Sequence, residues 1–254
     1  YYFKGTTPKT GSLKIDIVSP DTIVSEMKAG NYDIAEMPAD QLDSYKDASN
    51  LNLVGSLESA YEYISFNLGK YDEASEKNIM DENAKMNDVK LRQAIAYAID
   101  TKTAGEKLYN GLYHPATSLI ISFFGDLHDS EVEGYSYDPD KANELLDEAG
   151  YKDVDGDGIR EGKDGKEFKI TFAARKRTEA NEALVQQYIA WWKEVGLNVE
   201  LYTGRTVEIN TFYDAIQAND ASIDMYAGGW STGYDPNPNG LWGENAPFNM
   251  SRFV

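Results

Sequence analysis

The chain has 254 residues, of which 41% are hydrophobic, enough to form two modest lobes or one large domain. It has no cysteine, which excludes disulfide bonds, thiolate catalysis and cysteine-based zinc sites. The formal net charge of -19, from 43 acidic and 24 basic residues, would repel a phosphate backbone, so nucleic acid is not expected as a partner.

The first 86 residues are predicted to form an α/β unit. Residues 12–18 alternate apolar and polar side chains, which is the pattern of a half-buried strand. Ser19 and Pro20 have the residue types of a helix start, and Gly30 is typical of a helix end. Three more strands are predicted at residues 33–37, 51–54 and 61–67. A short helix is predicted at residues 40–46, and a polar loop at residues 70–86.

Residues 87–254 are predicted to form a second α/β unit. Asn87 is the expected N-cap of a helix that carries Leu91 and Ile95 on one stripe. Two more helices are predicted, from Asp100 to Asn110 and from Asp138 to Gly150. A strand at residues 168–172, a long helix at 179–195 and a second strand at 197–202 follow. This order predicts that the two strands are parallel neighbours in one sheet. A helix at 206–218 and a buried strand at 223–227 follow.

The stretch 228–240 is the strongest candidate for a binding site. Pro236 and Pro238 exclude a helix, while the Gly228–Gly229 pair allows another backbone to approach closely. A strand end that exposes its N–H and C=O groups beside Trp230 is suited to holding an extended peptide. The alternative from the residues alone is a surface loop with a packed tryptophan.

Residues Gly229–Gly233 formally match the G-x-S-x-G motif of serine hydrolases, and a predicted strand precedes them. That motif needs a helix just after Ser231, which Pro236 and Pro238 do not allow. It also needs a histidine downstream, and both histidines of the chain come earlier. The match is therefore interpreted as accidental.

Residues 153–164 form an aspartate loop with the D-x-D-x-D-G spacing of calcium sites. Its candidate ligands are Asp153, Asp155, Asp157, Ile159 and Glu161. The apolar residue comes one position earlier than in an EF-hand, position twelve is aspartate, and no second helix is predicted. The alternatives are a structural Ca²⁺ site and an Asp/Gly hairpin without an ion, and the hairpin is favoured.

Other site chemistry has weaker support. His114 and His128 lie near no acidic helix motif, so zinc is not expected. The Gly228–Gly229 pair lacks the lysine and helix of a phosphate loop. A carboxylate pair for glycoside hydrolysis stays open, because 43 acidic residues bring some together by chance. Trp191 and Trp192 lie at helical spacing with other apolar residues, which predicts core packing.

Several segments resemble the oligopeptide- and dipeptide-binding proteins of ABC importers, most closely those of Gram-positive bacteria. Leu91–Asp100 (LRQAIAYAID) resembles the signature helix of that family. Four other landmarks agree in order and spacing: the Tyr1–Gly5 turn, Tyr63–Asn67, Ala149–Tyr151 with its Asp/Gly hairpin, and Gly229–Trp230 followed by Asp235–Pro236. The similarity covers essentially the whole chain.

The resemblance implies an α/β, two-lobed, periplasmic-binding-protein-like fold of class C. The chain would then be a fragment that holds part of lobe I (residues 1–86) and most of lobe II (87–254). The implied protein is a monomer without catalysis, displayed at the extracellular face of the membrane by a lipid anchor, or in the periplasm. It would capture extended oligopeptides between its lobes and deliver them to a membrane permease, with no required cofactor.

The resemblance also implies a peptide-binding site. The peptide backbone would pair with the strand at Gly229, Trp230 and Ser231, with further contacts from Thr232, Gly233, Tyr234, Asp235, Tyr63 and Asn67. Some family members bind the peptide's amino terminus with an aspartate three residues after this tryptophan. Here that position is Gly233, and Asp235 or water would take its place. Two alternatives from other classes remain: a serine or carboxylate-pair hydrolase, and a calcium-stabilised interaction module.

Overall fold

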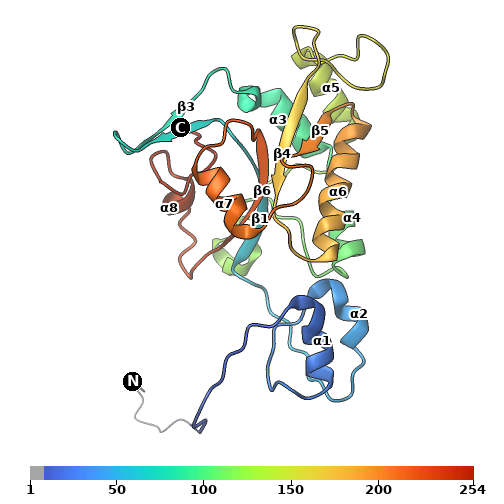
Figure 1. Cartoon of the computed structure of the whole chain (residues 1–254), viewed down its shortest axis with the longest axis vertical. Helices are drawn as coiled ribbons and strands as arrows, with labels where there is room; N and C mark the ends of the chain where they lie inside the picture. Colours follow the sequence, from blue (N-terminus) through green and yellow to red (C-terminus); the bar gives the residue numbers. More distant parts are fainter. Residues whose placement is uncertain (1–8) are drawn as a thin grey trace. The chain divides into compact units, whose positions relative to one another are not determined.

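The computed structural model describes residues 9–254 (Figure 1), so the Tyr1–Gly5 turn lies outside the described residues. The chain divides into two compact units, Tyr1–Leu53 and Val54–Val254. The sequence placed the division between residues 86 and 87. The strand predicted at 61–67 pairs with a strand near the end of the chain, inside the second unit, and the lobe boundary at residues 86 and 87 stays a prediction.

The first unit is small and helical in its described part. It contains α1 (Pro20–Lys28), the 3₁₀ turn η1 (Ala39–Gln41) and α2 (Leu42–Tyr45). The Ser19 hydroxyl accepts the N–H of Asp21, and proline occupies the first turn of α1, as the sequence predicted. Ile23, Val24 and Tyr45 form its buried core.

The three strands predicted in the first unit, at 12–18, 33–37 and 51–54, are absent from its described residues. Leu13, Ile15 and Ile17 of the first segment are 80%, 80% and 103% exposed. Alternation shows which face of a strand would be buried, but a strand also needs a hydrogen-bonding partner and a covering layer. The described part of this unit supplies neither, so the prediction was wrong for this chain.

The second unit is built on a four-stranded sheet with the order β1-β6-β4-β5 (Figure 1). The strands are β1 (Ala60–Phe66), β4 (Lys169–Ala174), β5 (Asn198–Leu201) and β6 (Met225–Ser231). β4 is parallel to β5 and to β6, whereas β1 is antiparallel to β6. The β4–α6–β5 unit, whose helix α6 spans Glu179–Glu194, confirms the predicted parallel pair.

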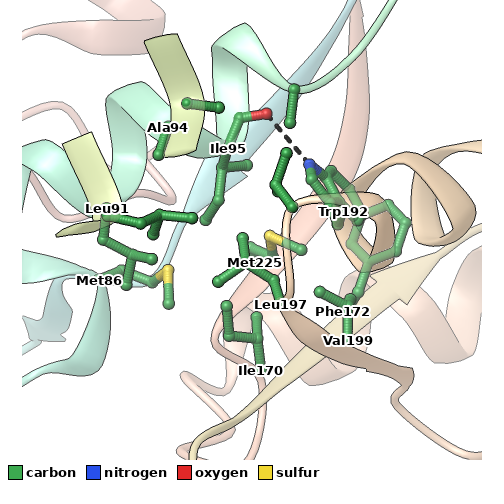
Figure 2. Close-up of a cluster of buried hydrophobic side chains, with 14 of the residues drawn as sticks. Met86, Leu91, Ala94, Ile95, Ile170, Phe172, Trp192, Leu197, Val199 and Met225 are labelled. Carbon is green, nitrogen blue, oxygen red and sulfur yellow. Dashed lines mark hydrogen bonds between the residues drawn. The ribbon is translucent and has the colours of Figure 1, made fainter. Parts of the chain in front are cut away.

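One face of this sheet carries α3 (Val89–Tyr97), α5 (Pro139–Ala149) and α6, and α7 (Ile209–Gln217) covers the other (Figure 1). The larger core lies between the sheet and helices α3, α5 and α6 (Figure 2). Trp192 is fully buried there, and its indole N–H donates to the carbonyl of Ile95 at 3.0 Å. The predicted core role of this tryptophan is confirmed.

The helix starts are set by side chains that accept free N–H groups. The N-cap of α3 is Asp88 rather than the predicted Asn87: the Asp88 carboxylate accepts the N–H groups of Lys90 and Leu91. Asp100 caps α4 (Thr101–Leu108) as predicted. Asp138 caps α5, and Gly150 ends it with a left-handed φ of 93°. The predictions were accurate here because capping is local chemistry.

Residues 70–86 are not the loop that the sequence predicted. They contain the hairpin of β2 (Gly69–Asp72) and β3 (Lys77–Met80), followed by the turn η2 (Lys85–Asn87). Polar strands without an apolar period give no sequence signal, and Asn78 is held by bonds to the carbonyls of Glu244 and Ala246, far along the chain. The remaining elements are η3 (Ser122–Leu127) and α8 (Asn239–Trp242). Among residues 9–254, no helix has both the length and the apolar character needed to cross a bilayer.

Candidate functional site

β6 extends beyond one of its two neighbours. On one side it pairs with β1 along its whole length, from Met225 opposite Phe66 to Ser231 opposite Ala60. On the other side it pairs with β4 only as far as Ala227, which lies opposite Ala174. Beyond the end of β4, Arg175 forms an isolated parallel bridge with Val207 instead of pairing with β6. One edge of residues 228–231 is therefore free of a strand among the described residues.

The direction of the amides shows which groups face this open edge. At one end of the β1–β6 pair, Asp224 accepts the N–H of Asn67 (2.8 Å); at the other end, Thr232 donates its N–H to Ser59 (2.6 Å). Successive residues of a strand point their N–H and C=O groups to alternate sides. The even-numbered residues thus face β1, and the main-chain groups of Gly229 and Ser231 face the open edge.

The sequence predicted an exposed main-chain edge near Trp230, and the structure leaves one edge of residues 228–231 without a strand partner. The other edge is paired with β1, and Thr232 fixes its end through a second bond, from its hydroxyl to the Ser59 carbonyl (2.9 Å). What remains is a two-residue main-chain edge of the kind that an added strand can pair with.

At both glycines, side chains of this chain lie close to where a Cβ would be. A Cβ on Gly228 would lie 2.6 Å from Cζ and Oη of Tyr63, which is the residue opposite it on β1. A Cβ on Gly229 would lie 3.1 Å from Nη2 of Arg175 and 3.2 Å from Oε1 of Glu62. The Tyr63 ring therefore lies against Gly228 on one face of the sheet.

Trp230 is half-buried and not a free aromatic platform. Its ring packs edge-on against Phe248, with centroids 5.9 Å apart, and it belongs to the smaller core around Phe212 and Tyr226. Its indole Nε1 is buried and has no hydrogen-bond partner among the described residues. The alternative of a packed tryptophan thus holds for the side chain, while the main chain beside it stays open.

The loop after β6 is exposed and extended. Tyr234 is 95% exposed, and Gly233 is also exposed. The Asp235 carboxylate accepts the N–H of Asn237 (3.0 Å) in a local turn. The chain forms no helix until α8, as the prolines predicted, and Ser231 lies within a strand, so the geometry of a hydrolase nucleophile is absent from this stretch.

Asn67 lies at the opposite end of β1 from this site. Its register places it beside Asp224, whereas the open edge lies beside Ala60–Glu62. Its side-chain amide donates to the carbonyl of Ile223 at 2.9 Å, which ties β1 to the start of β6. The structure therefore does not bring Asn67 together with Gly229 and Ser231.

A charged cluster that the sequence did not reveal lies beside Gly229. The Glu62 carboxylate accepts from Nη2 of Arg175 at 3.1 Å and from Nη1 of Arg177. The stacked rings of Tyr109 and Tyr113, with centroids 4.1 Å apart, adjoin Arg177, and burial raises the pKa of Tyr109 to about 12. The available signal was the Arg-Lys-Arg that follows the predicted strand 168–172, since the carboxyl ends of parallel strands form binding crevices.

The aspartate loop gathers only some of its predicted ligands. Carboxylate oxygens of Asp153, Asp155 and Glu161 lie within 4.8 Å of one another. The Asp157 carboxylate lies outside that group and accepts the N–H of Ile159 (2.7 Å). Asp153 and Glu161 also accept N–H groups of the loop, so the hairpin closes through its own hydrogen bonds.

The comparisons with known proteins identify the family of this chain. Residues 1–251 match the family described as bacterial extracellular solute-binding proteins, family 5 Middle. The chain is 36% identical to the oligopeptide-binding protein OppA of Lactococcus lactis subsp. cremoris (strain SK11), over 99% of this chain and 42% of that protein. It is 26% identical to the oligopeptide-binding protein AppA of Bacillus subtilis (strain 168), over 91% of this chain and 39% of that protein.

Solved structures of two proteins have a similar fold over most of this chain. Lactococcal OppA complexed with an endogenous peptide in the closed conformation matches with a TM-score of 0.88 and 35% identity, over 93% of this chain and 44% of that one. The AppA of Bacillus subtilis in complex with a nonapeptide matches with a TM-score of 0.73 at 22% identity, over 93% and 44%, and this likeness concerns the fold alone.

Sequence and fold together show the family of this chain. The chain belongs to family 5 of the bacterial extracellular solute-binding proteins, and it has part of the α/β fold of that family. It spans less than half the length of the relatives just described.

Proposed function

We propose that the protein to which this chain contributes captures extended oligopeptides for an ABC importer, by pairing the peptide backbone with the open edge of β6. The observation that carries the proposal is the two-residue main-chain edge at Gly229 and Ser231, where β6 continues and β4 has ended. Strand addition gives affinity through main-chain hydrogen bonds and tolerates varied side chains. Curated relatives named as oligopeptide-binding proteins support this reading.

The chain by itself supplies one side of such a site. Because it spans 42% of its lactococcal relative, we infer that other parts of a longer protein complete the cleft and close over the peptide. In that protein we expect a monomer held at the extracellular face of the membrane by a lipid anchor, or free in a periplasm, which passes peptide to a membrane permease. The relatives are named as binding proteins, and we propose binding without catalysis.

Replacing Ser231 tests the main-chain pairing. In the complete protein, Ser231→Pro removes the N–H that faces the open edge and leaves the bonds to β1 in place, because those come from even-numbered residues. Losing one net hydrogen bond, about 1 kcal/mol, should weaken peptide binding about fivefold in calorimetry.

Ser231→Ala is the matched control, since it changes only the side chain and keeps the N–H. Equal affinities for the proline and alanine variants would contradict pairing at this edge. A peptide hydrolysed by the unmodified protein but not by Ser231→Ala would favour the hydrolase instead.

We propose further that binding requires no cofactor, and that the aspartate loop acts as a structural hairpin. The support is its closure by internal hydrogen bonds, together with the Arg160 side chain, which connects the loop to α5 and α6. A structural Ca²⁺ at Asp153, Asp155 and Glu161 is the alternative, and chelation distinguishes the two.

A further inference from the structure

The cluster beside Gly229 has more positive than negative charge. Arg175 and Arg177 share the single carboxylate of Glu62, so two cations face one anion. The Arg175 side chain is only 13% exposed. A guanidinium has five N–H donors, and Arg175 reaches Glu62 through Nη2 alone. Buried arginine is costly unless its charge is paired, so this cluster is suited to receive a second carboxylate.

A second carboxylate, Glu58, acts on the pKa of Tyr113, but among the described residues the ion pairs of Arg175 and Arg177 are both with Glu62. Burial raises the pKa of both Tyr109 and Tyr113, so these phenols are neutral at physiological pH. The Arg175 guanidinium lies 5.8 Å from the ring centre of Tyr213, which contributes no formal charge. Lys176, between the two arginines, points toward Glu208, 3.8 Å away, and takes no part in the cluster.

The cluster lies on the face toward which the missing side chain of Gly229 would point. Arg175 Nη2 is 3.1 Å from the position that a Cβ of Gly229 would take. In a paired strand, directly opposite residues point their side chains to the same face, with Cβ positions about 4.5–5.5 Å apart. A peptide residue opposite Gly229 would therefore extend its side chain along the Arg175 guanidinium.

We propose that Arg175 and Arg177 form a subsite for a carboxylate of the bound peptide, the side chain of an aspartate or glutamate opposite Gly229. This inference rests on the proposed binding of peptides at β6. A guanidinium can donate two parallel hydrogen bonds to one carboxylate. Glu62 positions both guanidinium groups and also competes with the carboxylate of the ligand. The subsite gives local selectivity for an acidic residue in a chain whose net charge of -19 otherwise repels anions.

The test uses the complete protein and hexapeptides of alanine in which one glutamate, or one glutamine, is moved through the six positions. Calorimetry should show one position at which glutamate binds about tenfold more tightly than glutamine, the ratio that 1.4 kcal/mol gives. Arg177→Gln should abolish that preference. Glu62→Gln should increase it, because the internal competitor is lost, and a gain of affinity does not arise from misfolding. Lys176→Gln, with the same change of charge, should leave it unchanged.

Three results would overturn the subsite. These are equal affinities for glutamate and glutamine at every position, a preference that Lys176→Gln removes as fully as Arg177→Gln, and a preference that disappears when the peptide's C-terminus is amidated. The last would assign the arginines to the terminal carboxylate. If no hexapeptide binds at all, the proposed function fails, and that result differs from peptides that bind without charge selectivity.

Discussion

Gly228→Ala is expected to destabilise the second unit, whereas Gly229→Ala is expected to leave its stability nearly unchanged. The added methyl of Gly228→Ala would lie 2.6 Å from Cζ and Oη of Tyr63. That ring cannot easily move, because it packs edge-on against Trp242 at 4.9 Å and against Tyr226 at 6.3 Å. The methyl of Gly229→Ala would instead meet the ends of Arg175 and Glu62, at 3.1 and 3.2 Å, which are flexible.

The magnitude follows from two opposing effects. Adding a methyl to a packed core costs about 1–3 kcal/mol. Replacing glycine by alanine also removes conformational freedom from the unfolded chain, which stabilises by about 0.4–1 kcal/mol where the backbone is compatible. We therefore expect Gly228→Ala to lower the unfolding free energy by about 1–2 kcal/mol, and Gly229→Ala to change it by less than about 0.5 kcal/mol.

Urea unfolding of the chain measures both variants, with the midpoint compared at a constant m-value. A double-mutant cycle isolates the clash: in a Tyr63→Ala background, Gly228→Ala should cost nothing or stabilise slightly. If Gly228→Ala costs the same in both backgrounds, or if Gly229→Ala is the more damaging variant, the close packing of Tyr63 against β6 is not what requires glycine at 228.

Three more outcomes are expected. Arg160→Ala should lower the unfolding free energy by about 2–3 kcal/mol in urea titration, because it leaves the carbonyls of Tyr151 and Val195 without their donor; peptide affinity should stay the same. Excess EDTA or Ca²⁺ should not shift the melting temperature in scanning calorimetry, and a clear rise with Ca²⁺ would show that the aspartate loop holds an ion. Burial raises the pKa of Tyr109 and Tyr226 to about 12, above the unfolded value of about 10, so the folded state binds their protons more tightly. The stability that they contribute should be complete below pH ~10 and be lost as the pH rises to about 12, which tyrosinate absorbance followed together with unfolding would measure.

The local sequence was a reliable guide wherever a few adjacent residues decide the structure. Helix α5 is bounded by Asp138 and Gly150 as predicted, because an N-cap oxygen and a left-handed glycine act within one turn. The prolines at 236 and 238 kept residues 232–238 out of a helix for a similarly local reason. The one-residue error at α3, where Asp88 and not Asn87 is the cap, reflects two adjacent residues of nearly equal capping ability.

Pairing between distant segments was harder to predict from the sequence. Alternation predicted a strand at residues 12–18, and a lack of periodicity predicted a loop at 70–86, and both were wrong. Whether a segment becomes a strand depends on a partner that the segment does not encode. For the same reason the pairing of β1 with β6, which joins residues 60–66 to residues 225–231, could not be predicted from either segment alone.

The sequence by itself indicated the α/β class, the main helices and the family, and it predicted a binding edge near Trp230. Only the tertiary structure decided which edge of β6 is open, since that depends on β4 ending opposite Ala227 while β1 continues. It also brought Glu62 to Arg175 and Arg177, more than a hundred residues away along the chain, and moved Asn67 away from the site. Cap and turn chemistry acts between neighbours in sequence, whereas the ends of strands and the partners of buried charges are set by which distant segments pack together.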